Sequence, residues 1–244
     1  MIGSKTKDKL IIVVSGGSGR FGSILKKIKS KHKFYFPTKN KLNILNTKSI
    51  KKYLKKVKPD VFIHMAGLSR PMETHDTNFR KSIKLNIIGT ANVTNVCSEL
   101  NIKLIYLSTN FVYPGIRGSY KESDDLNPIN RYGWSKLGGE ASVQMYNNSL
   151  ILRICMTEEP FIHKSAFYDV KTNFEYHKKI APIVIKLINQ KGIINVGGKA
   201  QTVYQFAKSK KIKVKKIFSK SIYGKNYPNK QDMSLNKMKK ILGY

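Results

Sequence analysis

The sequence predicts an α/β fold, in which helices cover both faces of a doubly wound parallel sheet. Short apolar runs rich in β-branched residues alternate with longer segments whose apolar residues recur at a helical period, and this alternation is typical of parallel sheets. A glycine-rich turn joins the first apolar run to the first helical segment. After Cys155 the alternation weakens, so we expect a small region with fewer regular elements to follow the main sheet.

The elements of the main sheet are expected before Cys155. Residues 9–17 form a buried strand, because the run KLIIVVSGG is β-branched and stops at glycines. The segment 20–31 has a helical apolar period, and Pro37 ends the next strand, 33–38. The remaining elements follow in order: a helix over 47–58, a strand over 59–67, a helix within 78–101, a strand over 102–109, a loop to Asn130, a helix over 131–146 and a strand over 149–155.

Fewer regular elements are expected beyond Cys155. Residues 156–176 show no period and predict irregular structure, whereas 234–243 predicts a terminal helix capped by Ser234 and ended by Gly243. Between them we expect a helix over 180–190, a strand over 192–198, a short helix over 202–210 and a short strand over 211–218. The expected domains are 1–155 and 156–244, the second including elements that return to the main fold.

The glycine-rich turn predicts a dinucleotide site. Gly16, Gly19 and Gly22 fit the pattern G-x-x-G-x-x-G, and Gly17 with the last two fits G-x-G-x-x-G. Glycines at these spacings permit a tight turn, a close backbone approach to a pyrophosphate and close packing of helix on strand. Because the pattern lies between a strand and a helix at the start of the chain, we interpret 1–155 as a Rossmann-type dinucleotide-binding domain.

The stretch NRYGWSK, 130–136, holds a tyrosine four residues before a lysine. Residues i and i+4 share one helix face, so Tyr132 and Lys136 can meet. A free tyrosine has a pKa near ~10, and a neighbouring cation lowers it. The pair is therefore a candidate proton donor, and the alternative is a surface tyrosine beside one of many lysines.

The formal charge of +32 raises the question of a polyanionic partner. The basic residues are spread along the whole chain, and only six of the 46 are arginine, the better residue for planar phosphate recognition. We therefore expect no specific nucleic-acid partner, only weak attraction to polyanions that salt abolishes.

Two cysteines, Cys97 and Cys155, are too few for a disulfide framework and fit a reducing, cytoplasmic location. No apolar run approaches the ~18–20 residues that span a bilayer, so no membrane partner is expected. The amino-terminal apolar run leads directly into glycines and is interpreted as a strand rather than a signal peptide. No metal site is expected.

Together these motifs resemble the extended short-chain dehydrogenase/reductase family, and within it the dTDP-4-dehydrorhamnose reductase-like branch of sugar-nucleotide reductases. The resemblance runs from about residue 9 to 155 and returns weakly at 180–208 and 228–243. It is carried by the glycine loop, LNILNTKSIKKYLKKVKPDVFIHMAG, NIIGTANV, LSTNFVYPG, YGWSK and the tail PNKQDMSLNKMKKILG. These motifs stand in the family's order and spacing.

The resemblance implies a role for each matching residue. Tyr132 would donate a proton to a carbonyl oxygen as hydride reaches the carbon, and Lys136 would lower the tyrosine pKa and hold the nicotinamide ribose. Thr109 would hydrogen-bond the same oxygen, with Ser108 as a weaker substitute. The cofactor-binding residues implied are Gly16, Gly19, Arg20, Phe21, Gly22, Lys39, Asn43, Ala66, Gly67, Asn86, Tyr132 and Lys136.

The sequence departs from the family at three places. Asn43 stands where relatives have an aspartate that contacts adenine, and Asn110 replaces the acidic residue of the S-T-D motif. Relatives that dehydrate sugars carry Asp-Glu after the threonine, whereas this chain has Asn110-Phe111. The segment 156–179 is shorter than the family's usual substrate-binding region.

The charge around the expected adenosine ribose favours NADP(H). An NAD-type site places an acidic residue on the ribose 2′-hydroxyl about ~20 residues beyond the glycine loop. Between Asp8 and Asp60 the chain has no Asp or Glu. We expect Arg20 and Lys39 to favour a 2′-phosphate, while NAD(H) stays an alternative because Asn40 could serve the hydroxyl.

The resemblance therefore implies an NAD(P)H-dependent reductase of a 4-keto nucleotide sugar. An epimerase of the same family is an alternative, since it uses the same three residues with a retained cofactor. A second alternative is a non-catalytic subunit that binds NADP or a nucleotide sugar. The sugar, the nucleotide and the oligomeric state stay open, with a homodimer as one option.

Overall fold

The computed structural model describes residues 8–224 and 227–244, and it confirms the predicted fold class. A six-stranded, wholly parallel sheet has the order β2-β1-β3-β4-β5-β8. Its strands are β1 (Ile11–Ser15), β2 (Lys33–Tyr35), β3 (Val61–His64), β4 (Lys103–Thr109), β5 (Ser149–Ile154) and β8 (Gly192–Val196). The order reverses between β1 and β3, and ligands of such sheets bind outside the carboxyl ends of the strands at this switch point.

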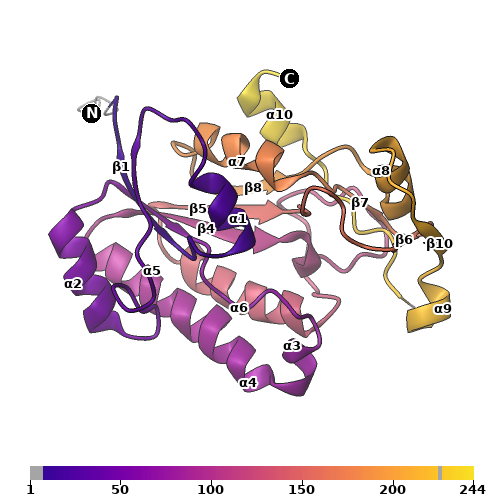
Figure 1. Ribbon diagram of the computed structural model, residues 1–244. Helices are drawn as coiled ribbons and strands as arrows, with labels where there is room; N and C mark the ends of the chain where they lie inside the picture. The colour runs from indigo at the N-terminus through magenta and orange to yellow at the C-terminus, as the bar shows by residue number, and fades with distance from the viewer. Residues whose placement is uncertain (1–7, 225–226) are drawn as a thin grey trace.

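Helices cover both faces of the sheet (Figure 1). One layer holds α2 (Thr47–Val57), α5 (Gly89–Glu99) and α6 (Arg131–Gln144), with α3 (Thr74–Thr77) and α4 (Phe79–Ser82) near its end. The other layer holds α1 (Arg20–Leu25), α7 (His177–Lys186) and α10 (Asn236–Leu242).

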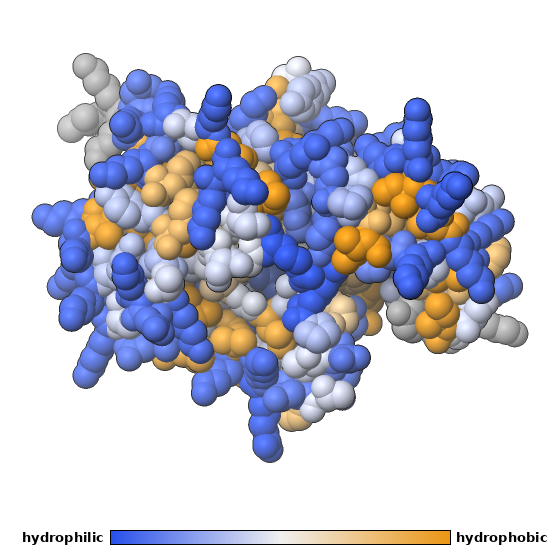
Figure 2. Space-filling model, viewed as in Figure 1, coloured by the Kyte–Doolittle hydropathy of each residue, from blue (hydrophilic) through white to orange (hydrophobic). Residues whose placement is uncertain are grey.

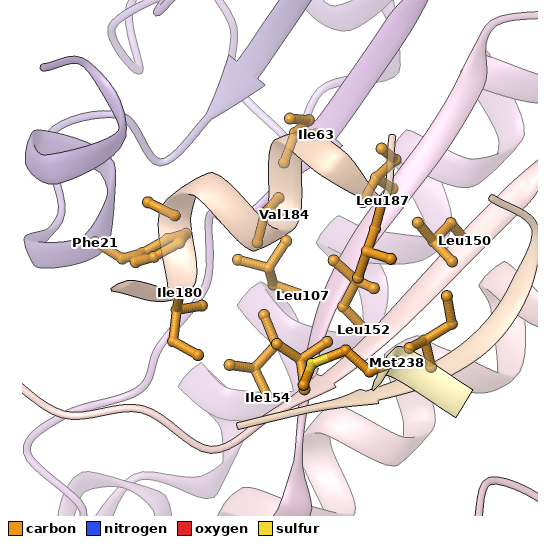
Figure 3. Close-up of a cluster of buried hydrophobic side chains, with 14 of the residues drawn as sticks. Phe21, Ile63, Leu107, Leu150, Leu152, Ile154, Ile180, Val184, Leu187 and Met238 are labelled. Carbon is orange, nitrogen blue, oxygen red and sulfur yellow. The ribbon is translucent and has the colours of Figure 1, made fainter. Parts of the chain in front are cut away.

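The α7 layer is held by a continuous apolar core. Figure 3 shows Ile180, Val184 and Leu187 from this layer facing strand residues such as Leu107 and Leu152. All three helix-layer side chains are 0% exposed, and full burial of a side chain of this size stabilises the fold by about 1.5–3 kcal/mol. The sequence beyond residue 155 is thus needed to cover the sheet.

The opposite layer shows how a lysine-rich segment forms a helix. In α2, Ile50 and Leu54 are buried while the lysines face outward, and the Asn46 side chain caps the first turn by accepting from the backbone N–H of Ser49 at 3.0 Å. Hydrophilic side chains cover most of the face seen in Figure 2, as the charge of +32 requires.

The rest of the carboxyl-terminal region forms a small lobe at the right of Figure 1. Its elements are β6 (Ser165–Phe167), β7 (Lys171–Thr172), β9 (Gln201–Thr202), α8 (Val203–Ser209), β10 (Lys215–Ile217) and α9 (Lys220–Tyr223). A separate apolar cluster that includes Phe161, Tyr176 and Phe206 holds the lobe together. The predicted division at residue 155 stays a prediction, and residues 1–7 of the first predicted domain lie outside the described part of the chain.

Several predicted elements differ from the observed ones. The segment 156–176 contains β6 and β7 rather than irregular structure alone, because β6 pairs with distant β10. The helix expected over 20–31 ends at Leu25, and like charges such as Lys27 and Lys31, four residues apart, disfavour its extension. The strand expected over 33–38 ends at Tyr35.

Two further predicted helices differ from the observed ones. The segment 78–101 is helical but in three pieces, with the π-helix η1 (Ile83–Ile88) between α4 and α5. Ser234 does not cap the last helix, which begins at Asn236 with Leu235 in the N-cap position; the Ser234 backbone N–H donates to the Tyr120 carbonyl. Gly243 ends the helix as predicted, with a φ of 75°.

Among the described residues, no helix combines the length and apolar character needed to cross a membrane.

Candidate active site

A pocket of about 620 Å³ lies where the loops after β1 and β3 meet the ends of β4 and β5. This volume is within the ~300–1,000 Å³ usual for small-molecule sites. Every residue predicted for the site lines it: Gly16, Gly19, Arg20, Phe21, Gly22, Lys39, Asn43, Ala66, Gly67, Asn86, Thr109, Tyr132 and Lys136. Their roles stay predictions, but their convergence is an observation.

The glycine loop is tightly folded. Gly16 has a φ of +76°, and a Cβ there would lie 2.7 Å from the Ala66 backbone nitrogen. A Cβ on Gly22 would lie 2.5 Å from the Gly16 carbonyl oxygen. Only glycine fits either position, and the loop thereby leaves its backbone free to approach a ligand.

Buried polar groups fix the ends of β1 and β3 beside this loop. The Ser15 hydroxyl lies 2.8 Å from His64 Nδ1 and accepts from the backbone N–H groups of Met65 and Ala66. His64 Nε2 lies 3.1 Å from the Thr90 hydroxyl. Complete burial lowers the pKa of His64 to about 3, so the ring is neutral and the network adds no charge.

Asn86, in η1, ties the loop after β3 to helix α6. Its Oδ1 accepts from the Leu68 backbone N–H at 2.7 Å, and its Nδ2 donates to the Leu68 carbonyl and to the Ser135 hydroxyl, each at 2.8 Å. The side chain therefore positions neighbours of Gly67 and Lys136 rather than standing free in the pocket.

Tyr132 lies in an aromatic setting at the end of the pocket. Its ring centroid is 5.1 Å from that of His75 and 5.9 Å from that of Phe111. Burial raises the pKa of Tyr132, while a hydrogen bond with Thr109 and the charges of Arg70 and Arg20 act in the lowering direction. The raised pKa keeps the phenol protonated at neutral pH, so Tyr132 carries the proton that a donor needs.

Lys136 is not a surface lysine, and its pKa is not that of a free one. It is buried, and its Nζ lies 4.0 Å from the centroid of the Tyr106 ring. Burial lowers the pKa of Lys136 to about 7, and the charge of Glu140 acts in the raising direction. The role of Lys136 in lowering the tyrosine pKa stays a prediction: burial raises the pKa of Tyr132, and the charges that oppose this rise are those of Arg70 and Arg20.

A buried ion pair behind the site was missed from the sequence. Glu140 Oε1 accepts from Arg153 Nε at 3.0 Å, and Glu140 Oε2 accepts from the Ser108 hydroxyl at 2.7 Å. Ser108 is thus committed to Glu140, which leaves Thr109 as the hydroxyl next to Tyr132. The order Tyr-x-x-x-Lys-x-x-x-Glu in one helix was the available signal, because it puts Glu140 on the same face.

A second missed group is Glu158, which follows β5. Its Oε1 lies 3.0 Å from both Arg20 Nη1 and Arg70 Nη1. Glu158 and Arg70 each stand shortly after the carboxyl end of a central strand, and that position could have identified them. Arg20 is therefore engaged by a carboxylate of the β5–β6 segment, whereas Lys39 is exposed and lines the pocket.

Comparison with known proteins gives the family. Residues 10–157 match the family model described as the RmlD substrate binding domain. A dTDP-D-glucose 4,6-dehydratase from Dictyostelium discoideum is 32% identical over 226 residues, which covers 83% of this chain and 48% of that protein. Methionine adenosyltransferase 2 subunit beta from Xenopus laevis is 32% identical over 114 residues, or 46% of this chain and 34% of that protein. The chain thus spans about half the length, or less, of these curated relatives.

Solved structures agree on the fold. A dTDP-4-dehydrorhamnose reductase from Bacillus anthracis, solved in complex with NADP, has a TM-score of 0.84 at 22% identity, covering 97% of this chain and 94% of that one. A dTDP-4-dehydrorhamnose reductase from Clostridium acetobutylicum has a TM-score of 0.81 at 20% identity, covering 96% and 92%. The family match spans more than half of the sequence, and the chain belongs to the RmlD substrate binding domain family, within the extended short-chain dehydrogenase/reductases.

Proposed function

We propose that this protein is an NAD(P)H-dependent reductase of a 4-keto nucleotide sugar. The observation that carries the proposal is the convergence of Thr109, Tyr132 and Lys136 in one pocket with the glycine loop. The pocket has the parts that carbonyl reduction needs: a protonated phenol, a hydroxyl beside it and a backbone cradle for a dinucleotide.

Each residue has a distinct task in this proposal. The nicotinamide would supply the hydride when bound. Tyr132 would donate its phenolic proton to the carbonyl oxygen, and Thr109 would hydrogen-bond that oxygen as negative charge develops. Lys136, with a pKa of about 7, would hold the ribose of the dinucleotide and regain full charge when the tyrosine becomes a phenolate, because opposite charges stabilise each other in a buried site.

We propose NADP(H) as the preferred cofactor, with Lys39 as the main cation. Glu158 is the only acidic residue that the described part of the chain puts around the pocket, and it pairs with Arg20 and Arg70. A 2′-phosphate beside Lys39 therefore meets no carboxylate that is free to repel it. The Bacillus anthracis reductase solved with NADP supports this direction.

A dehydratase function is less well supported, although one relative carries that name. Dehydration needs an additional acid and base to remove water. The residues after Thr109 are Asn110, whose carboxamide does not titrate and so serves as neither acid nor base, and Phe111, whose ring packs on Tyr132. The chain offers no carboxyl group at either position.

A non-catalytic subunit is the second candidate, and the similarity to methionine adenosyltransferase 2 subunit beta favours it. The epimerase alternative differs from the reductase in retaining its cofactor. NAD(H) that survives purification would indicate an epimerase. A protein that binds NADPH but turns over no 4-keto nucleotide sugar would indicate the subunit. The cytoplasmic location and the homodimer stay predictions.

The experiment is a reductase assay with NADPH and dTDP-4-dehydrorhamnose, run on the unmodified protein and on Tyr132→Phe. Removing one hydroxyl takes away the proton donor and little packing volume, so reduction should fall by about 10²-fold or more. NADPH affinity, measured by titration, should change less than about twofold, because the ring that packs against the pocket is retained. Retained turnover by Tyr132→Phe would contradict the proposed role.

A further inference from the structure

Glu158 bridges two arginines that belong to different walls of the pocket. Arg20 is the first residue of α1, within the glycine motif between Gly19 and Gly22, and Arg70 lies in the loop after β3. Both guanidinium groups contact the same carboxylate oxygen, Oε1, at 3.0 Å. Among the described residues the other oxygen, Oε2, is buried without a hydrogen-bond partner.

The three side chains differ in how far they are exposed to solvent. Glu158 is the most enclosed, with 15% of its side chain exposed, against 46% for Arg20 and 35% for Arg70. Arg20 is therefore the member of the cluster that can move away at least cost. Arg70 can keep the Glu158 charge paired when Arg20 leaves, which matters because an unpaired charge in a partly buried site is costly.

We propose that Glu158 is an affinity-determining residue of the dinucleotide site: its carboxylate competes with the diphosphate of the bound cofactor for Arg20. The inference rests on the proposed function, which puts the diphosphate against the glycine loop that contains Arg20. Guanidinium groups bind carboxylates and phosphates through the same paired N–H groups, so the two anions are alternatives for one partner.

The competition has a consequence for turnover. When the diphosphate takes the Arg20 Nη1 that contacts Glu158, part of the gain from the new contact is offset by the lost ion pair. The carboxylate then stays with Arg70 and faces the phosphates as a like charge. Both effects loosen the cofactor, which suits a reductase that exchanges its cofactor in every cycle better than an epimerase that retains it.

Glu159 provides a matched control one residue away. Its carboxylate pairs with Lys178 at 2.7 Å, and it does not line the pocket. Glu159→Gln therefore removes the same formal charge from the same segment without releasing either arginine. Any difference between Glu158→Gln and Glu159→Gln reports the local contact and not the net charge of the protein.

The test is titration of NADPH into the unmodified protein and the variants Glu158→Gln, Glu159→Gln, Arg20→Met and the double variant Arg20→Met/Glu158→Gln. Glu158→Gln should tighten NADPH by about two- to fivefold, the range of a partly exposed ion pair. Glu159→Gln should change the affinity less than about twofold, and the gain from Glu158→Gln should vanish in the Arg20→Met background. Glu158→Ala, which removes the carboxylate by a different replacement, should act in the same direction.

Two competitors test whether the gain acts through phosphate. The gain should appear for ADP and be absent for adenosine, which lacks the diphosphate. Unchanged or weaker NADPH binding by both Glu158 variants, a gain that persists without Arg20, or an equal gain for adenosine would overturn the inference while leaving the proposed function standing. Failure of the unmodified protein to bind either NADPH or NADH would remove both.

Discussion

At the scale of single residues, the structure separates two lysines that composition alone cannot tell apart. Lys39 is exposed, whereas Lys136 is buried against the ring of Tyr106. The Tyr-x-x-x-Lys spacing singled out Lys136 among 40 lysines, but spacing could not reveal its pKa. Burial sets that value, and burial depends on β4, which supplies Tyr106.

Lys136 should make the protein less stable at neutral pH than a variant without the charge. The folded pKa is about 7, below the 10.5 of a free lysine, so between these values the unfolded chain binds more protons and stability rises with pH. Lys136→Met should raise the free energy of unfolding at pH 7 by about 1–2 kcal/mol. It should also flatten the rise in stability between pH 7 and 10.

Denaturant melts of both proteins across this pH range check the prediction. An exposed lysine on α2, changed as Lys52→Met, is the control and should leave the pH profile unchanged. A destabilised Lys136→Met variant whose pH profile is unchanged would show that Lys136 stays charged in the folded protein.

Cofactor preference should depend on Lys39 and not on Arg20. Arg20 is held by Glu158 and is proposed to meet the diphosphate, which both cofactors carry. Arg20→Ala should therefore change the NADPH and NADH affinities by the same factor. Lys39→Ala should lower the NADPH-to-NADH affinity ratio about two- to fivefold, because it removes the cation expected at the 2′-phosphate. Titration of both cofactors at physiological salt measures the ratio. Tighter NADH than NADPH binding by the unmodified protein would contradict the preference itself.

At the scale of elements, the β1–loop–α1 unit is where local sequence determined most of the site. Gly16 combines a φ of +76° with no room for a Cβ. Gly16→Ala should therefore lower the free energy of unfolding by about 1–3 kcal/mol and abolish dinucleotide binding, because the loop must move away from Ala66.

Gly192 is the matched control for that change. It has a φ of +80°, but no atom lies within 4 Å of the point that a Cβ would occupy, so Gly192→Ala incurs the backbone strain without a clash. It should destabilise the protein and leave NADPH affinity unchanged. Melting curves and NADPH titration of both variants distinguish strain from lost geometry. Normal NADPH binding by Gly16→Ala would contradict the account of the loop.

Elements that depend on distant partners were harder to predict. The glycine loop and the strand before it are adjacent in the chain, so their pattern was sufficient. β6 pairs with β10 about fifty positions later, and a three-residue strand carries too little period to be seen alone. Glu158 lies far in sequence from Arg20 and Arg70; its place after a central strand puts it at the same edge of the sheet, but no local pattern shows that its carboxylate contacts both arginines.

At the scale of the whole molecule, the excess of positive charge opposes the compact state. The formal charge is +32 with only 14 acidic residues, and like charges on a folded surface repel one another. In about 0.1 M salt, the repulsion between exposed charges that lie more than about 10 Å apart is largely screened. The melting temperature should therefore rise by several degrees as NaCl is raised from about 10 mM to 0.3 M.

The control for that prediction is sucrose at a concentration that matches the osmolality of the salt, because sucrose does not screen charge. Equal shifts in salt and sucrose would show that repulsion is not the cause. A melting temperature that falls with salt would indicate that exposed ion pairs, such as Lys51 with Glu99, outweigh the repulsion.

The most direct test of the central claim, reduction of a carbonyl by hydride from a nicotinamide, is label transfer. The protein is incubated with dTDP-4-dehydrorhamnose and NADPH that carries deuterium at the transferred position, and the sugar product is analysed by mass spectrometry. Tyr132→Phe is run beside it. The account predicts a reduced sugar that carries the label with the unmodified protein and none with the variant. NADPH that binds tightly while the sugar stays unreduced and unlabelled would contradict the reductase and favour the non-catalytic subunit.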